Sequence, residues 1–415
     1  MRIALLSIPL LLLLISACDE STTSHSTMNT QLSEGIWRGV LNIGTDEEVL
    51  EVPFNFEVAA NNQITILNGE ERIEVKDVNI DSNHLTIQMP VFGSDFKLDL
   101  QDGSLQGNWH NYNKDNYQLP FQASPNSSNR FGPVTKNHSK TLAKRWKVVF
   151  SPDTDNAYPA IGLFETNNEG TATGTFLTET GDYRYLEGVF DGQELKLSCF
   201  DGSHVFLFKA QLDAAGALNG TFWSGKHWKE PWTAVPNDSF ELRAMDALTY
   251  LKEGYEQIDF SFPDKDSQYL SMEDTRFDGK VTIVQITGSW CPNCMDETNF
   301  LVDLYDQYHS RGLEIVAIDY ELKDKFEIFV ESQARLNKHL GVQYPILYGG
   351  IANKTKASET WPMLNQIISY PTTLFLDKNK KIRQIHTGFS GPGTGVIYER
   401  YVQKTTSFIE QLLAE

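Results

Sequence analysis

Two cysteines separated by two residues have the clearest capacity for chemistry in this sequence. Cys291 and Cys294 follow an apolar run and precede a helical pattern, with Trp290 before them and Pro292 and Asn293 between them. Two thiols at this spacing in a first helical turn can form and open a disulfide with little backbone movement. Unpaired amides and the dipole at the helix start favour the thiolate of Cys291. We therefore expect Cys291 to be an exposed nucleophile and Cys294 to be shielded.

Two other uses of the cysteine pair remain open from the residues alone. A structural zinc site would need a second pair of ligands at comparable spacing, and the sequence contains no further Cys-x-x-Cys pattern. A purely structural disulfide would close so short a loop that it would constrain little of the unfolded chain. Redox exchange is therefore the stronger interpretation.

The residues around the pair resemble a known family. Phe262-Pro263, the segment Phe-Asp-Gly-Lys-Val at 277–281, the Trp-Cys-Pro-Asn-Cys motif and Glu297 are similar to those of the TlpA/ResA-like redoxins. These are thiol-disulfide oxidoreductases of bacterial envelopes, and the resemblance covers 255–415. It implies an α/β thioredoxin-like domain. The family usually has proline directly before the second cysteine, whereas Pro292 directly follows the first, a difference that bears on the redox potential.

The resemblance also implies roles for two further residues. Pro371 matches the cis-proline that faces the disulfide in thioredoxin-like folds and leaves nearby backbone free to pair with a substrate. Glu297, three residues after Cys294, matches an acid that influences cysteine acidity and proton movement in this family. Thioredoxin has a buried acid at the position of Gln285, which cannot take up a proton, so a carboxylate contribution must come from elsewhere. No cofactor is expected.

Patterns in the rest of 255–415 agree with an α/β domain. The run 313–319 predicts a buried strand, and 326–340 has apolar residues at helical spacing. A further helix is expected to end near Ile368. Strands are expected at 372–376 and 382–386, and the alternation of strands and helices predicts a parallel core.

The N-terminus reads as an export signal. Residues 1–17 combine Arg2 with an apolar stretch that is short for a membrane span, as in a lipoprotein signal peptide. The sequence before Cys18 resembles a lipobox, which implies that Cys18 is lipidated and holds the protein on a membrane. An ordinary cleaved signal with a chance cysteine is the alternative. Residues 18–34 are polar and aperiodic, and we expect a flexible tether.

Two related β segments separate the tether from the redox domain. Apolar and polar residues alternate over 35–125 and again over 145–242, with a linker at 126–144. Trp37 corresponds to Trp146, so a duplication of about 110 residues is expected. We predict roughly eight antiparallel strands per repeat, forming small barrels, sandwiches or one composite sheet. Residues 243–254 are expected to form a connector with a short helix.

Two features of the second repeat bear on function. Cys199 shares the parity of neighbouring leucines, so we expect a buried, inert thiol. An aromatic cluster in the same repeat is expected mainly to pack, and it is also the best candidate for a partner surface; its members are Phe222, Trp223, His227, Trp228 and Trp232.

The function predicted from these observations is that of a thiol-disulfide oxidoreductase anchored by lipid in the bacterial envelope. Its partners would be protein disulfides or dithiols and a membrane electron donor. The formal net charge of −20 argues against nucleic acid. Two alternatives remain. One is a peroxiredoxin-like peroxide reductase, although the Thr-x-x-Cys signature of such redoxins is missing, and the other is an envelope binding or assembly lipoprotein with an accessory redox domain.

Overall fold

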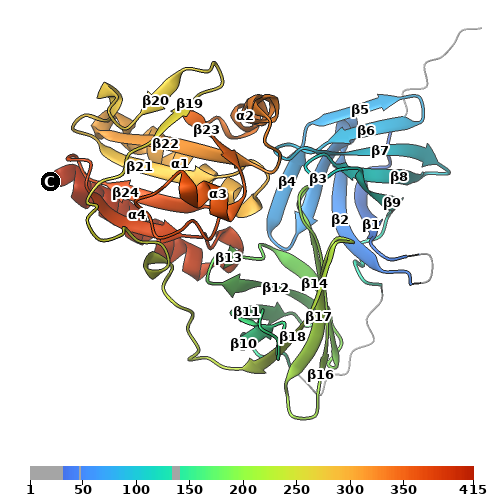
Figure 1. Cartoon of the computed structure of the whole chain (residues 1–415). Coiled ribbons are helices and arrows are strands. Elements are labelled where there is room, and N and C mark those ends of the chain that lie inside the picture. Colours follow the sequence, from blue (N-terminus) through green and yellow to red (C-terminus); the bar gives the residue numbers. More distant parts are fainter. Residues whose placement is uncertain (1–30, 46–47, 133–140) are drawn as a thin grey trace, which may run out of the picture.

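The computed structural model describes residues 31–45, 48–132 and 141–415. It contains two antiparallel β-sheets followed by an α/β domain, which lies beside both sheets (Figure 1). The predicted signal peptide, the predicted lipidation site Cys18 and most of the predicted tether lie outside the described residues.

The first sheet has nine strands in the order β4-β3-β2-β1-β9-β8-β7-β6-β5. Its two end strands, β4 and β5, are separated in the chain by Lys76 alone, so the backbone passes there from one end of the sheet to the other and makes it barrel-like. The strands are β1 (Gly35–Asn42), β2 (Glu51–Ala59), β3 (Gln63–Asn68), β4 (Glu71–Val75), β5 (Asp77–Asp81), β6 (His84–Gln88), β7 (Ser94–Gln101), β8 (Ser104–Asn111) and β9 (Tyr117–Pro125).

The second sheet also has nine strands, in the order β11-β10-β18-β17-β16-β15-β14-β12-β13. An additional pairing of β11 with β12 joins its ends into a closed barrel. The strands are β10 (Arg145–Phe150), β11 (Tyr158–Thr166), β12 (Thr171–Thr178), β13 (Gly181–Asp182), β14 (Leu186–Phe190), β15 (Glu194–Phe200), β16 (Val205–Leu212), β17 (Leu218–Ser224) and β18 (Trp228–Pro236).

The two barrels are copies of one unit at the level of strand register. Trp37 pairs with Pro125 in the first barrel, and Trp146 pairs with Pro236 in the second. Both indole rings are almost fully buried. The predicted all-β region of two repeats is therefore confirmed, and the two copies form separate sheets rather than one composite sheet.

The barrels share part of their apolar packing. Phe200, at the end of β15 in the second barrel, lies in the core of the first and stacks on Phe54 with ring centroids 4.6 Å apart. Its neighbour Cys199 faces the core of its own barrel and is completely buried, as its parity predicted. Burial of large aromatic rings contributes strongly to association. Packing of Phe200 therefore holds the two barrels together.

The α/β domain is built on a five-stranded sheet in the order β23-β22-β21-β24-β25. The strands β21, β22 and β23 are parallel, while β24 runs antiparallel to β21. This confirms the predicted thioredoxin-like fold class. The elements are β19 (Ser261–Pro263), β20 (Tyr269–Ser271), β21 (Val281–Thr287), α1 (Pro292–Tyr308), β22 (Leu313–Glu321), α2 (Phe326–Leu340), β23 (Ile346–Ile351), α3 (Lys354–Glu359), β24 (Thr372–Leu376), β25 (Ile382–Thr387) and α4 (Val396–Ala414).

Two helix predictions were wrong. The connector 243–254 contains only the 3-10 turn Met245–Ala247, because its later residues bond to the α/β domain, as in the bridge between Leu251 and Leu364. The helix expected to reach Ile368 ends at Glu359, three residues before Pro362, whose ring cannot continue an α-helix. None of the helices that the structure describes is long and apolar enough to cross a membrane.

Candidate active site

The cysteine pair lies at the junction of β21 and α1. Cys291 is the residue that caps the start of α1, and its Sγ accepts a hydrogen bond from the amide of Cys294 at 3.3 Å. Pro292 occupies the first turn, where a missing amide hydrogen costs nothing. The capping contact places the sulfur of Cys291 against the amides at the start of the helix.

The two thiols differ in access, although less than the sequence suggested. Both are free thiols in the structure, with Cys291 7% exposed and Cys294 fully buried. The expectation of an exposed Cys291 was therefore wrong, because the second barrel covers the active-site loop: Ser203 Oγ donates a hydrogen bond to the Trp290 carbonyl at 3.1 Å. Burial, together with the neighbouring thiol, raises the pKa of Cys294 well above its ordinary value. Cys291 still lines a cavity, and Cys294 does not.

The loop before β24 faces Cys291. The Tyr370–Pro371 peptide bond is cis, and Cys291 Sγ donates to the Tyr370 carbonyl at 3.5 Å. The ring of Tyr370 packs edge-on against Trp290, with centroids 5.7 Å apart. Cys291 is thus enclosed between its own helix and the segment before β24.

Both residues between the cysteines bond to side chains or backbone far away in the sequence. The Pro292 carbonyl accepts a hydrogen bond from Arg184 Nη1 at 3.0 Å. Asn293 Nδ2 donates to the carbonyls of Asp182 and Phe389, each at 3.1 Å. Asp182 and Arg184 belong to the second barrel, so that barrel holds the active-site turn in place.

Arg184 joins all three parts of the molecule. Besides Pro292 it contacts Glu71 of the first barrel, Asp201 of the second at 3.3 Å, and Asp296 of α1 at 2.5 Å. The side chain is 9% exposed, so these ion pairs are largely shielded from water. Sequence reasoning missed this residue, because a single arginine in a β-repeat has no local pattern that reveals partners more than 100 residues away.

Glu297 is buried below the cysteine turn. Its carboxylate accepts hydrogen bonds from Gln285 Nε2 at 2.9 Å and Thr373 Oγ1 at 2.7 Å. Burial raises the pKa of Glu297 to about 7, although these two donors oppose the rise. The carboxyl group can therefore gain or lose a proton near neutral pH. Gln285, which stands where thioredoxin has a buried acid, thus donates a hydrogen bond to the Glu297 carboxylate.

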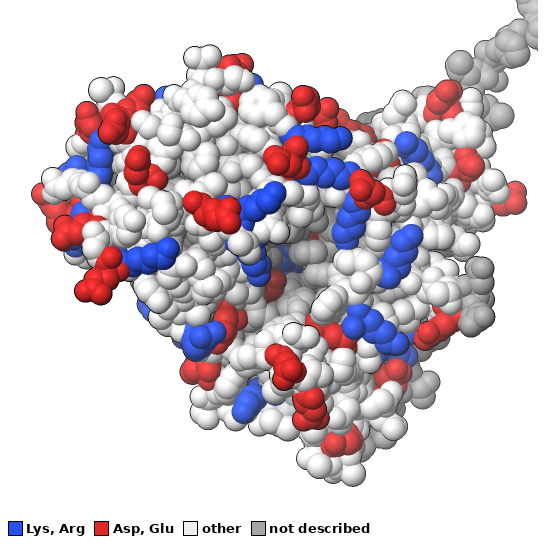
Figure 2. Space-filling view, viewed as in Figure 1, with Lys and Arg blue, Asp and Glu red and all other residues white. Residues whose placement is uncertain are grey.

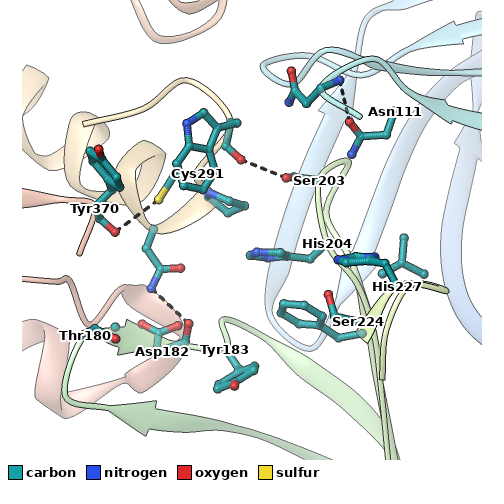
Figure 3. A pocket seen from close by; sticks show the side chains of 18 of the residues that line it. Asn111, Thr180, Asp182, Tyr183, Ser203, His204, Ser224, His227, Cys291 and Tyr370 are labelled. Carbon is teal, nitrogen blue, oxygen red and sulfur yellow. Dashed lines mark hydrogen bonds between the residues drawn. The ribbon is translucent and has the colours of Figure 1, made fainter. Parts of the chain in front are cut away.

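Cys291 opens into a cavity of about 660 Å³ that all three parts line. In Figure 3, Cys291 and Tyr370 lie on one side, with His204 and His227 across from them. Asp182 and Tyr183 of the second barrel border the same space. The β region thus forms walls of the site, a role that periodicity alone did not indicate. Among the described residues, no cluster of three or more His, Cys, Asp or Glu side chains could hold a metal ion.

Comparison with known proteins gives the same assignment for the C-terminal part. The AhpC/TSA family model matches residues 254–385. The thiol-disulfide oxidoreductase ResA of Bacillus thuringiensis subsp. konkukian is 28% identical over 155 residues, which are 37% of this chain and 78% of that protein. ResA of Geobacillus thermodenitrificans is 30% identical over 131 residues, 31% of this chain and 66% of that protein.

Two solved structures give partial matches. A secreted thiol-disulfide isomerase from Corynebacterium glutamicum has a TM-score of 0.31 and 17% identity, covering 43% of this chain and 99% of that one. A thiol-disulfide oxidoreductase from Bacteroides fragilis has a TM-score of 0.27 and 19% identity, covering 35% and 99%.

The part of the chain that these sequence matches cover includes β21, Cys291, Cys294 and α1. The C-terminal region therefore contains an AhpC/TSA redoxin domain at 254–385, and this region is similar to the thiol-disulfide oxidoreductase ResA.

Proposed function

We propose that this protein exchanges electrons with protein disulfides or dithiols of the bacterial envelope through Cys291 and Cys294. The observation that carries the proposal is the unequal position of the two thiols. Cys291 caps α1 and lines the cavity, whereas Cys294 is buried behind it with a raised pKa. Such asymmetry suits an attacking thiol and a resolving thiol.

The reaction proceeds in two exchanges. The thiolate of Cys291 attacks one sulfur of the substrate disulfide, forms a mixed disulfide and releases the other substrate sulfur as a thiolate. Cys294 then loses its proton and attacks Cys291 Sγ, which forms the Cys291–Cys294 disulfide and releases the second substrate sulfur. The substrate gains two electrons and two protons, and a membrane electron donor would regenerate the dithiol.

Two residues are assigned supporting roles in this proposal. Glu297 begins the next helical turn after Cys294 and titrates near neutral pH, which supports a role in proton movement during the second exchange. The carbonyl of Tyr370, the residue before Pro371, contacts Cys291, which supports a role for this segment in receiving the substrate backbone.

The proposed location rests on the sequence before the folded part. A lipoprotein signal at 1–17, a lipidated Cys18 and a tether at 18–34 would hold the redox site on a membrane surface. The same proposal divides the rest into repeats at 35–125 and 145–242, a linker at 126–144, a connector at 243–254 and the redox domain at 255–415.

A thiol count under defined redox conditions tests the proposal. The protein is equilibrated in buffers of graded dithiothreitol ratio, alkylated and analysed by mass spectrometry. We expect Cys291 and Cys294 to change together and reversibly, while the buried Cys199 stays reduced. A pair that never oxidises, or oxidation that stops at Cys291 with hydrogen peroxide as the favoured oxidant, would contradict disulfide exchange.

A further inference from the structure

The cavity in front of Cys291 carries a pair of basic side chains at equivalent places in the two barrels. Lys114 lies in the turn between β8 and β9, and His227 lies in the turn between β17 and β18. They are 113 residues apart, the same offset that relates the paired-strand residues Leu105 and Leu218 of the two copies. Packing the barrels side by side brings these matching turns together on one wall of the cavity.

The positive charge of Lys114 has no carboxylate partner. Its Nζ lies 2.9 Å from Nε2 and 3.2 Å from Nδ1 of His227, and 4.8 Å above the Tyr117 ring. An ammonium group only donates, so the ring nitrogen that it contacts must accept and the imidazole must be neutral. Among the described residues, no Asp or Glu lies within ion-pair distance of Lys114.

The acidic groups of the cavity wall are already engaged. Among the described lining residues they are Glu179 and Asp182. Glu179 forms an ion pair with Arg243 at 2.5 Å. Asp182 accepts hydrogen bonds from the backbone amides of Arg184 and Gly391. The unsatisfied charge that faces the cavity is therefore positive.

Partial burial agrees with this geometry. Burial lowers the pKa of Lys114 to about 8. The pKa of His227 is also lowered, by its own burial and by the neighbouring charge of Lys114. Near neutral pH Lys114 is still mainly charged, and an entering carboxylate would give it a charge-assisted hydrogen bond. On the face shown in Figure 2 the surface is hollowed where the three parts meet, and several Lys and Arg side chains lie around the hollow.

We propose that Lys114 and His227 form an anion subsite that holds a carboxylate of the disulfide substrate while Cys291 attacks. This inference rests on the proposed function and deepens it by naming the substrate class: disulfides flanked by carboxylate groups. A cavity of about 660 Å³ lies within the usual range of roughly 300–1,000 Å³ for small-ligand sites. It has room for a small acidic disulfide or a short acidic segment of an unfolded protein.

Three small disulfides of different charge test the subsite. The reduced full-length protein is given dithiodipropionate, which is anionic, bis(2-hydroxyethyl) disulfide, which is neutral, and cystamine, which is cationic. We expect the second-order rate constant for oxidation of the reduced protein to be about tenfold higher with the anionic than with the neutral compound, a difference of about 1.4 kcal/mol, because the charged Lys114 donates a hydrogen bond to the carboxylate. Cystamine should be the slowest.

Variants then assign the preference to the subsite. Lys114→Gln should reduce the ratio of anionic to neutral rates to about one, and Lys114→Arg should restore it, because arginine keeps the charge. Lys226→Gln is the matched control: Lys226 lies 5.0 Å from the same Tyr117 ring but does not line the cavity, so the ratio should not change.

The outcomes separate the subsite from the chemistry. Equal rates for all three disulfides in the wild type, or an unchanged ratio in a folded Lys114→Gln protein, would overturn the subsite and leave disulfide exchange standing. Failure to reduce any of the three would overturn both. If Lys114→Gln does not fold, the comparison of the three disulfides with the wild-type protein still tests the subsite. Oxidised glutathione and a disulfide-linked acidic peptide are then compared, and the compound whose rate falls more on Lys114→Gln identifies the source of the carboxylate.

Discussion

Replacing Glu297 with glutamine should stabilise the redox domain in a pH-dependent way. Glu297 is 1% exposed, and burial raises its pKa from 4.5 to about 7. The folded protein therefore binds this proton more tightly than the unfolded chain does. The stability associated with the carboxyl group is complete below about pH 4.5 and is lost as the pH rises through about 7.

The size of the effect follows from the two pKa values. The difference between 4.5 and about 7, at 1.36 kcal/mol for each pH unit, gives about 3 kcal/mol. Glutamine has nearly the same shape and is never charged. Its amide can still accept a bond from Gln285 and donate one to Thr373. The unfolding free energy of Glu297→Gln should therefore exceed that of the wild type by up to about 3 kcal/mol at about pH 8, with little difference at about pH 4.

The buried cysteines provide the assay. The reduced protein is unfolded in urea at several pH values, alkylated briefly and digested, and mass spectrometry follows each thiol. Cys294 reports the redox domain, and Cys199 reports the second barrel. Asp303→Asn, which changes an exposed carboxylate on the same helix, is the control. A difference between Glu297→Gln and wild type that is the same at all pH values would refute the reasoning.

Three further predictions concern other parts of the chain. Arg184→Met should lower the free energy of unfolding by about 3–5 kcal/mol, since it leaves Glu71 and Asp296 buried without their cation. Faster alkylation of Cys291 in the folded variant would show that the barrels have loosened from α1, and an unchanged rate would argue against this anchoring role. Cys18→Ser should leave the protein unprocessed or soluble, and membrane fractionation with unchanged anchoring would reject lipidation. Cys199→Ala should leave the reduction of bis(2-hydroxyethyl) disulfide intact, because Cys199 is buried in the core of the second barrel and does not line the cavity; loss of activity in a folded variant would require a redox role for it.

Local sequence patterns were sufficient to predict several elements of the fold. The prediction of helix 326–340 coincides with α2, because regular apolar spacing and a following Gly341 specify its face and its end. The repeat was also predicted from the sequence, and the equivalent pairings of Trp37 with Pro125 and of Trp146 with Pro236 agree with it.

Contacts between segments far apart in the sequence were not predicted. The burial of Cys291, the Arg184 ion pairs and the Lys114–His227 pair all depend on how the two barrels pack against α1, which no local period encodes. The same limit explains the connector 243–254, where bonds to the α/β domain replace the expected helix. The helix α4 was not predicted at all.

The most direct test of the account is the trapping of mixed disulfides by single cysteine variants. Cys294→Ala retains the attacking thiol but cannot resolve the intermediate, so it should accumulate envelope proteins linked to Cys291. Cys291→Ala should accumulate few, because Cys294 is fully buried and does not line the cavity. Non-reducing electrophoresis and mass spectrometry of the linked peptides identify the sulfur involved. Adducts on Cys291 in Cys294→Ala are the predicted result, and adducts that form on Cys294 in Cys291→Ala instead would contradict the assignment of the nucleophile.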